Sequence, residues 1–285
     1  MKQYVIIITL ISTLLGGSSC KEWLKVDSED RIMEDALFQS ESGFFTALNG
    51  VYVHLLNTNL YGRTLTAGTF DILAQYYDTT NPLNSHTYRS LANFELQAKK
   101  DAVADTWKEA YFLIANINTI LEHCENDRSV LSESNYELIK GECLALRAML
   151  HFEMFRIFGP IYSYEPGKVC IPYSDDTEKN VKPLLSAIDV VDKILTDLNQ
   201  AENLLLNVDP VITKGPQSSA EGNNRLRYRN LRLNYFAVQA LTARVYLYAG
   251  NTTEAGRYAR KVISGASKFF PFATREQVNG QAATG

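Results

Sequence analysis

The chain has 285 residues, of which 46% are hydrophobic and 21% are charged, so it is long enough to bury the core of one large domain or two smaller ones. Its formal net charge of −4 argues against a nucleic-acid-binding protein, because such a protein gains much of its affinity by neutralising phosphates. Four cysteines (Cys20, Cys124, Cys143 and Cys170) show no C-x-x-C spacing, so a zinc or redox site has no support. We expect no nucleic-acid partner, metal or cofactor.

The first twenty residues have the layout of an export signal. Lys2 precedes an apolar run at residues 4–15, which is too short to span a bilayer comfortably, and small residues then lead to Cys20. This ending resembles a bacterial lipobox, in which the cysteine is acylated and becomes the first residue of the mature protein. The resemblance predicts a lipoprotein signal peptide at 1–19 and stable membrane anchoring through lipid chains on Cys20. The alternative is an ordinary signal peptide that is cut nearby, with Cys20 as an incidental thiol.

Residues 20–36 show no hydrophobic periodicity, and we interpret them as a tether between the membrane and a folded domain at 37–285. Helical spacing begins after Phe38. Ser40 or Ser42 can cap the first helix, because a hydroxyl accepts hydrogen bonds from the free N–H groups of a first turn. The apolar stripe of this helix consists of Phe44, Leu48, Val51 and Leu55.

Residues 57–97 are irregular and predict a loop-rich insert with a short helix near residues 70–77. Part of this insert has the composition of a carbohydrate site, because aromatic rings stack on the apolar faces of pyranose rings and polar side chains hold the hydroxyls. The alternative is that each ring packs in the core or within the loop. The candidate ligand-binding residues are Tyr76, Tyr77, Asn81 and Tyr88.

The stretch from Tyr136 to Phe158 predicts a helix with two apolar faces, which is typical of a helix covered from both sides in a solenoid or a multilayer bundle. Gly159-Pro160 ends this helix, because proline lacks an N–H group. A helix at 103–124 precedes it and must lie antiparallel to it, because the connection is short. His151 lies one turn after Arg147, and we interpret it as structural. The two faces are Leu144, Ala145, Ala148, Phe152 and Phe155, and Ile139, Cys143, Leu146, Leu150 and Ile157.

The second half of the chain continues with helices and loops. A connection at 161–182 with an extended piece at 169–173 leads to a helix at 183–206, and residues 209–224 have the composition of an exposed loop. Four arginines follow, which we expect to face solvent or to pair with Glu202 and Glu221; an anionic partner is the alternative. They are Arg225, Arg227, Arg229 and Arg232.

A helical hairpin is predicted at the end of the chain. Ala243, Tyr246, Gly250, Ala255 and Val262 have the spacing of the two-helix unit of the tetratricopeptide repeat. In that unit a small residue lets the helices touch, an aromatic ring fills the gap and a glycine turns the chain. A generic αα-hairpin is the alternative. Together the elements predict an all-α fold of tetratricopeptide-like hairpin repeats with long irregular loops.

The sequence contains no motif of a known catalytic machinery. It has no G-x-S-x-G, G-x-G-x-x-G, Walker A or H-E-x-x-H pattern, and its four histidines are scattered. We therefore predict no catalytic residue and expect that the protein is not an enzyme. A helical hydrolase with paired carboxylates stays a minor alternative, because the separation of two carboxylates in space cannot be seen in a sequence.

Three stretches together resemble the SusD/RagB family of outer-membrane nutrient-binding lipoproteins. They are Cys20 followed by Trp23-Leu24, the run GECLALRAMLHFEMFRIFGPI at 141–161 and the run ALTARVYLYAGN at 240–251. The resemblance covers essentially the whole chain but only about the front half of a typical member, so we expect a truncated chain.

The resemblance implies an all-α, SusD-like superhelix that is lipid-anchored at the outer membrane and exposed on the cell surface. Such a protein captures a glycan or another oligomeric nutrient and delivers it to a TonB-dependent transporter barrel, on which it sits as a lid. The alternative from another class is a periplasmic tetratricopeptide scaffold that binds only proteins.

Overall fold

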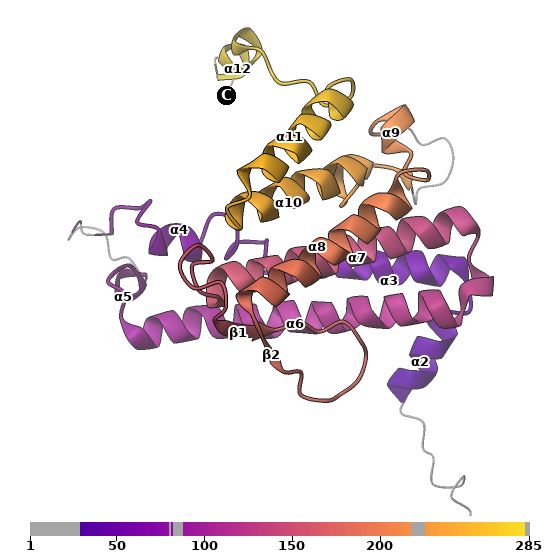
Figure 1. Ribbon diagram of the computed structural model, residues 1–285, viewed down its shortest axis with the longest axis horizontal. Coiled ribbons are helices and arrows are strands. Elements are labelled where there is room, and N and C mark those ends of the chain that lie inside the picture. The colour runs from indigo at the N-terminus through magenta and orange to yellow at the C-terminus, as the bar shows by residue number, and fades with distance from the viewer. Residues whose placement is uncertain (1–28, 80, 82–87, 218–225, 283–285) are drawn as a thin grey trace, which may run out of the picture.

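The computed structural model describes residues 29–79, 81, 88–217 and 226–282, and they are mostly helical (Figure 1). The predicted signal peptide at 1–19, Cys20 and the first part of the tether lie outside the described residues. No helix in the described part of the chain is both long enough and apolar enough to cross a membrane.

The body of the protein is a stack of long helices, which confirms the predicted all-α class (Figure 1). Two antiparallel strands form a small sheet that contacts α7 and α8. The long helices are α3 (Glu41–Leu55), α6 (Leu96–Asn126), α7 (Glu133–Phe158), α8 (Ala187–Leu205), α10 (Tyr235–Tyr248) and α11 (Thr252–Ala266). The short elements are α2 (Glu29–Leu37), α4 (Thr69–Leu73), α5 (Arg89–Ala92), β1 (Val169–Pro172), β2 (Leu184–Ser186), α9 (Val211–Lys214), α12 (Arg275–Ala282) and the 3-10 helices Arg128–Val130 and Arg229–Leu231.

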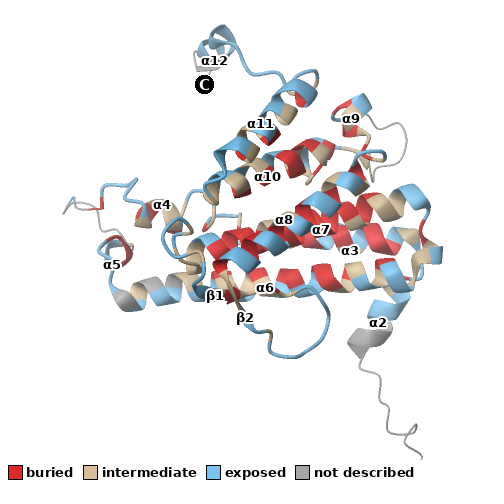
Figure 2. Ribbon diagram, viewed as in Figure 1, coloured by how far each residue is buried: buried red, intermediate tan, exposed pale blue. Residues whose placement is uncertain are grey.

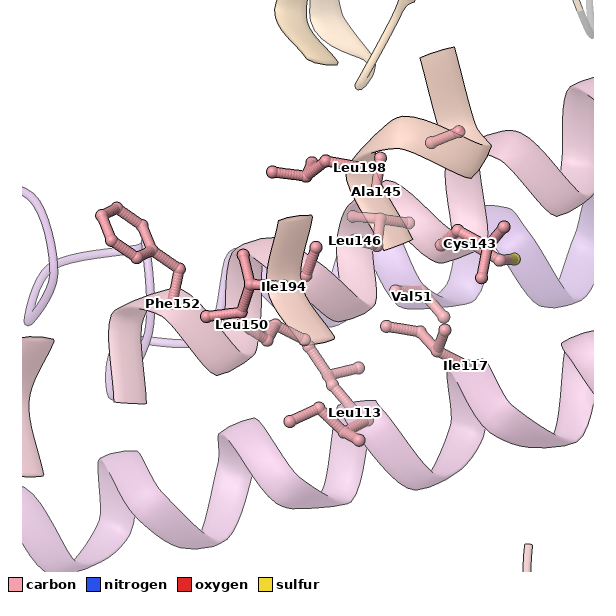
Figure 3. Close-up of a cluster of buried hydrophobic side chains, with 14 of the residues drawn as sticks. Val51, Leu113, Ile117, Cys143, Ala145, Leu146, Leu150, Phe152, Ile194 and Leu198 are labelled. Atoms are coloured by element: carbon pink, nitrogen blue, oxygen red, sulfur yellow. The ribbon is translucent and has the colours of Figure 1, made fainter. Parts of the chain in front are cut away.

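Helix α7 is covered on both sides, as its two apolar faces predict. All residues from Gly141 to Ala148 are buried, and Figure 2 shows α7 as the most continuously buried helix of the stack. Helices α3 and α6 contact it, and so does α8. Figure 3 shows the resulting cluster, in which Cys143, Leu146 and Leu150 of α7 lie with Val51 of α3, Leu113 and Ile117 of α6, and Ile194 and Leu198 of α8.

Gly141 lets α7 approach the end of α8. A Cβ atom at this position would lie 2.8 Å from Cγ of Leu205, which is fully buried. We therefore expect Gly141→Ala to lower the free energy of unfolding by about 1–3 kcal/mol, as overpacking of a core does. Gly50 in α3 is the matched control: a Cβ there would meet nothing within 4 Å, so Gly50→Ala should raise this free energy by about 0.5–1 kcal/mol. Urea denaturation measures both, and effects of the same sign would contradict the prediction.

The ends of several helices differ from the predicted ones. The Ser40 side chain accepts a hydrogen bond from the N–H of Gly43 at 3.1 Å, which confirms Ser40 as the cap of α3. The helix predicted at 183–206 begins only at Ala187, because β2 pairs with β1 and this pairing takes up the preceding backbone groups. Helix α6 is longer than the predicted 103–124. Residues 226–233 form turns and a short 3-10 helix, and α10 begins at Tyr235.

A helix begins at Glu29, so the predicted absence of periodic structure is wrong for residues 29–36. Contacts with α6 stabilise this segment, whose sequence shows no hydrophobic periodicity. His123 of α6 lies with its Nε2 3.1 Å from Oε1 of Glu34, and its ring stacks on that of Phe38 at 4.0 Å between centroids. Phe38 is buried and joins the main core.

The helical hairpin at the end of the chain is confirmed as α10 and α11. Gly250 lies between them with a φ of +80°, a left-handed conformation that favours glycine. Tyr246 of α10 stacks on Tyr258 of α11, with 5.7 Å between the ring centroids. Ala255, predicted to be the small residue of α11 at the crossing, is buried.

Candidate functional site

The predicted ligand-binding residues lie at one end of the helical stack, around α4 and α5 (Figure 1). The loop that leads into α4 is held firmly. Leu60 is fully buried, and the Thr106 hydroxyl of α6 donates a hydrogen bond to the carbonyl oxygen of Asn59 at 2.9 Å. Gly62 lies so close to the preceding turn that a Cβ there would come within 2.1 Å of the Leu56 carbonyl oxygen. The site therefore rests on a loop with a defined conformation.

Helices α4 and α5 pack against each other through a small apolar cluster of Ile72, Leu91 and Ala92. Gln75 joins them, because its Nε2 donates to the Ala92 carbonyl oxygen at 3.0 Å. Tyr88 packs against the same cluster and is half-buried. Part of the Tyr88 ring therefore packs within the insert, which is the alternative role to ligand binding.

Tyr76 and Tyr77 follow α4 directly and project into solvent, with 78% and 48% of their surfaces exposed. Asn81 is also exposed, and its carbonyl oxygen accepts a hydrogen bond from Nη2 of Arg89 at 3.3 Å. Exposed tyrosine rings offer an apolar face and a hydroxyl at little cost in side-chain entropy, which suits stacking on a sugar ring. We call Tyr76 and Tyr77 the tyrosine surface.

A polar pocket of about 330 Å³ lies beside α4 and α5. Tyr88 is one of its walls, and Asn59, Arg63, Asp101 and Asp105 supply amide, guanidinium and carboxylate groups. These groups can donate and accept hydrogen bonds with hydroxyls. These four polar residues are not predicted from the sequence; their one signal there is the i, i+4 spacing of Asp101 and Asp105, which places them on the same face of a helix.

A larger groove of about 790 Å³ lies between α3, α7 and the segment at 227–233, and its character is different. Val53, Leu56 and Leu231 line it and are 69%, 69% and 70% exposed. Exposed apolar side chains of this size suit contact with a protein surface better than with sugar hydroxyls.

Two ionic networks flank α7 and hold loops onto it. In the first, Arg147 donates to both carboxylate oxygens of Asp197 at 2.7 Å, and the Tyr173 hydroxyl donates to the same carboxylate at 2.6 Å. The ring of His151 stacks on Tyr173 at 3.8 Å, and its Nε2 accepts from the N–H of Ser174 at 3.0 Å. The stacking on Tyr173 and the hydrogen bond from Ser174 fix the position of the His151 ring. His151 is therefore structural, as predicted.

The neutral state of His151 makes a pH dependence testable. Burial is the main cause that lowers its pKa to about 3, against about 6.5 in an unfolded chain. As pH falls, the unfolded state therefore binds the proton before the folded state does. The contribution of neutral His151 to the free energy of unfolding is fully present above about pH 6.5, and the free energy falls by about 1.4 kcal/mol per pH unit as pH drops toward the folded pKa. His151→Gln keeps a donor and an acceptor but does not titrate. Between pH 7 and 5 the wild type should lose about 2 kcal/mol more than this variant in urea denaturation; equal losses would contradict the assignment.

The second network overturns the prediction that Arg229 faces solvent or pairs with Glu202 or Glu221. Arg229 is only 1% exposed and forms ion pairs with Asp209 and Glu142, and the Tyr52 hydroxyl donates to Glu142 at 2.6 Å. The N–H of Leu233 donates to the Tyr52 hydroxyl at 2.9 Å, which ties the segment at 226–233 to α3 and leaves Arg229 buried. Arg232, in contrast, is half-buried and donates to Asn49. Arg225 lies outside the described residues.

Comparison with known proteins places the chain among relatives of one kind. A family model described as "Starch-binding associating with outer membrane", of the SusD-like type, matches residues 22–222. SusD-like protein P25 of Formosa agariphila is 25% identical over 224 residues, which cover 74% of this chain and 40% of that protein. SusD-like protein P38 of the same organism is 27% identical over 210 residues, covering 72% and 39%. The chain thus spans about two fifths of the length of these curated relatives.

Solved structures share the fold. A SusD superfamily protein from Bacteroides thetaiotaomicron superposes with a TM-score of 0.64 at 19% identity, over 84% of this chain and 49% of that one. A SusD-like carbohydrate binding protein from Bacteroides vulgatus superposes with a TM-score of 0.63 at 20% identity, over 83% and 47%. At these identities the likeness establishes the helical architecture.

Proposed function

Because the chain belongs to the SusD-like family, whose model covers residues 22–222, we propose that it is a lipid-anchored binding protein of the outer membrane that captures a glycan without catalysis. The tyrosine surface carries this proposal. Tyr76 and Tyr77 are exposed shortly after the end of α4, and Thr69 at the start of α4 lines a pocket with groups that can hold hydroxyls. A binding protein needs this combination of stacking faces and converging polar groups.

The ligand contacts of the proposal are Tyr76 and Tyr77 for stacking, and Asn81 and Tyr88 at the neighbouring polar groups. Tyr76→Ala combined with Tyr77→Ala should weaken binding of oligosaccharides about tenfold, because two stacking contacts are lost. Isothermal titration calorimetry with malto-oligosaccharides and other neutral oligosaccharides measures the loss. Tyr164→Ala is the matched control, because Tyr164 is 80% exposed on a different loop. Equal affinities of the double variant and the control would refute the assignment.

The proposed membrane anchor is diacylated Cys20, with 1–19 as the signal peptide; the tether predicted at 20–36 is proposed to end before α2, which begins at Glu29 and packs on the helical body. The lipobox-like residues that end at Cys20 support it. Mass spectrometry of the mature amino terminus tests this part alone. An acylated Cys20 is the expected result, and an unmodified first residue at another position would remove the anchor.

We propose a TonB-dependent barrel as the partner to which the ligand is delivered. Co-purification of a large outer-membrane barrel with the protein would support this proposal. The groove between α3 and the segment at 227–233 favours a second candidate function, a periplasmic tetratricopeptide scaffold for proteins, because its apolar side chains are exposed. Pull-down of soluble proteins without a barrel, together with no binding of any glycan, would favour this second function.

A further inference from the structure

A second pocket shares α4 with the polar pocket. It has a volume of about 310 Å³ and lies between α4 and the last turns of α7. Phe70 and Leu73 of α4 line it, together with Glu153 and Arg156 of α7, whereas Thr69 of the same short helix lines the polar pocket. A ligand that lies along α4 can therefore reach both pockets.

The charges at this second pocket are not balanced. The Glu153 side chain is 7% exposed and accepts from Nη1 of Arg156 at 2.6 Å, and Nη2 of Arg244 on α10 lies 3.5 Å from its other oxygen. Both guanidinium groups lie near the ring of Phe152, at 5.9 and 5.7 Å from its centroid. Within the described part of the chain, neither arginine forms an ion pair with any other carboxylate. Two positive charges thus share one negative charge.

The second arginine is not needed to neutralise Glu153. A buried carboxylate requires a charged or hydrogen-bonded partner, and Arg156 supplies one with good geometry. Arg244 has a 55% exposed side chain and only a long contact, which contributes little to stability. Most of its N–H donors are left for solvent or a ligand. A guanidinium is suited to bind a carboxylate or a sulfate through two parallel hydrogen bonds.

We propose that Arg156 and Arg244 bind an acidic group, a uronate carboxylate or a sulfate ester, on a glycan held at the tyrosine surface. This inference rests on the proposed function and narrows its ligand to acidic glycans. The polar pocket, which α4 lines through Thr69, is unsuited to the acidic group, because Asp101 and Asp105 there outnumber Arg63. The two pockets therefore give the glycan a direction along α4.

Arg244→Gln tests the proposal while Arg156 still neutralises Glu153. Isothermal titration calorimetry compares oligogalacturonate, a sulfated carrageenan oligosaccharide and neutral cello-oligosaccharides. The variant should bind the acidic ligands about tenfold more weakly and the neutral ligands unchanged, as expected for the loss of a charge-assisted contact. Arg257→Gln is the matched control, because Arg257 is also half-exposed, pairs with Glu254 and lies over an aromatic ring. Arg156→Lys keeps the charge and should weaken acidic binding by loss of the bidentate geometry.

A loss with either acidic ligand identifies which of the two acidic groups is bound. Equal affinity of wild type and Arg244→Gln for both acidic ligands overturns the inference, and so does a wild type that prefers neutral ligands. If neutral oligosaccharides still bind through Tyr76 and Tyr77, the proposed function stands without it. A wild type that binds no glycan of either kind overturns both.

Discussion

We expect Arg229→Met to lower the free energy of unfolding by about 3–5 kcal/mol. The side chain of Arg229 is 1% exposed, and it donates to the two oxygens of Asp209 at 3.0 and 2.7 Å and also to Glu142. Methionine fills much of the volume but leaves two carboxylates buried without their cation. An unpaired charge in a protein interior costs far more than a lost contact at the surface.

A surface arginine supplies the comparison. Arg260→Met is the control, because Arg260 is exposed on α11, and it should change the free energy of unfolding by less than about 0.5 kcal/mol. Urea denaturation at pH 7 measures both variants. Equal losses for Arg229→Met and Arg260→Met would show that the buried network does not stabilise the fold.

Arg147→Met is expected to have an effect of similar size, about 3–5 kcal/mol, for the same physical reason. Asp197 is 5% exposed and would lose both hydrogen bonds from the guanidinium. Arg147 also donates to the Asn118 amide oxygen at 3.0 Å and to the Asp175 carbonyl oxygen at 3.1 Å, so the loop after β1 would lose a support. Faster amide hydrogen exchange at Ser174 should accompany the loss of stability.

A double variant separates the charge from the shape. Replacing both partners, Arg147→Met with Asp197→Leu, removes the orphaned carboxylate and should recover part of the stability, because a buried ion pair can be replaced by apolar groups at small cost. Thermal and urea unfolding of the two single variants and the double variant form a mutant cycle. A double variant that is less stable than Arg147→Met alone would contradict this account of the network.

The sequence predicted the helices well where a long apolar pattern exists. The two apolar faces of α7 were sufficient to predict that both sides of the helix are buried. The pattern lies within one helix, so the prediction requires no knowledge of which distant residues cover it. Some short elements are not predicted from the sequence. Helix α5 has only four residues, and the residues of β2 are predicted to be helical because Leu184 fits a helical stripe as well as a strand.

The partners of the buried charges could not be predicted. Arg147 and Asp197 are 50 residues apart, and Glu142 and Arg229 are 87 apart. Spacing in a sequence reports only neighbours on the same element, so Arg229 was expected to face solvent. Two residues of the family-like stretch at 141–161 have a physical role in the structure. Glu142 and Arg147 each hold a distant loop against α7.

The candidate site was predictable in its composition and not in its shape. The tyrosines and Asn81 were identified from residue type alone, but nothing in the sequence distinguishes exposed Tyr76 from half-buried Tyr88. The polar pocket combines residues from the loop before α4 with Asp101 and Asp105 of α6, which only the fold brings together. Likewise, only the packing of α7 and α10 brings Arg156 and Arg244 to the same carboxylate, that of Glu153.

A crystal structure of the protein soaked with an oligosaccharide that it binds in solution is the most direct test of the proposed function. We predict sugar rings stacked on Tyr76 and Tyr77, with hydroxyls directed into the pocket beside Tyr88. Sugar density confined to any other surface, with Tyr76 and Tyr77 still facing solvent, would contradict the proposal.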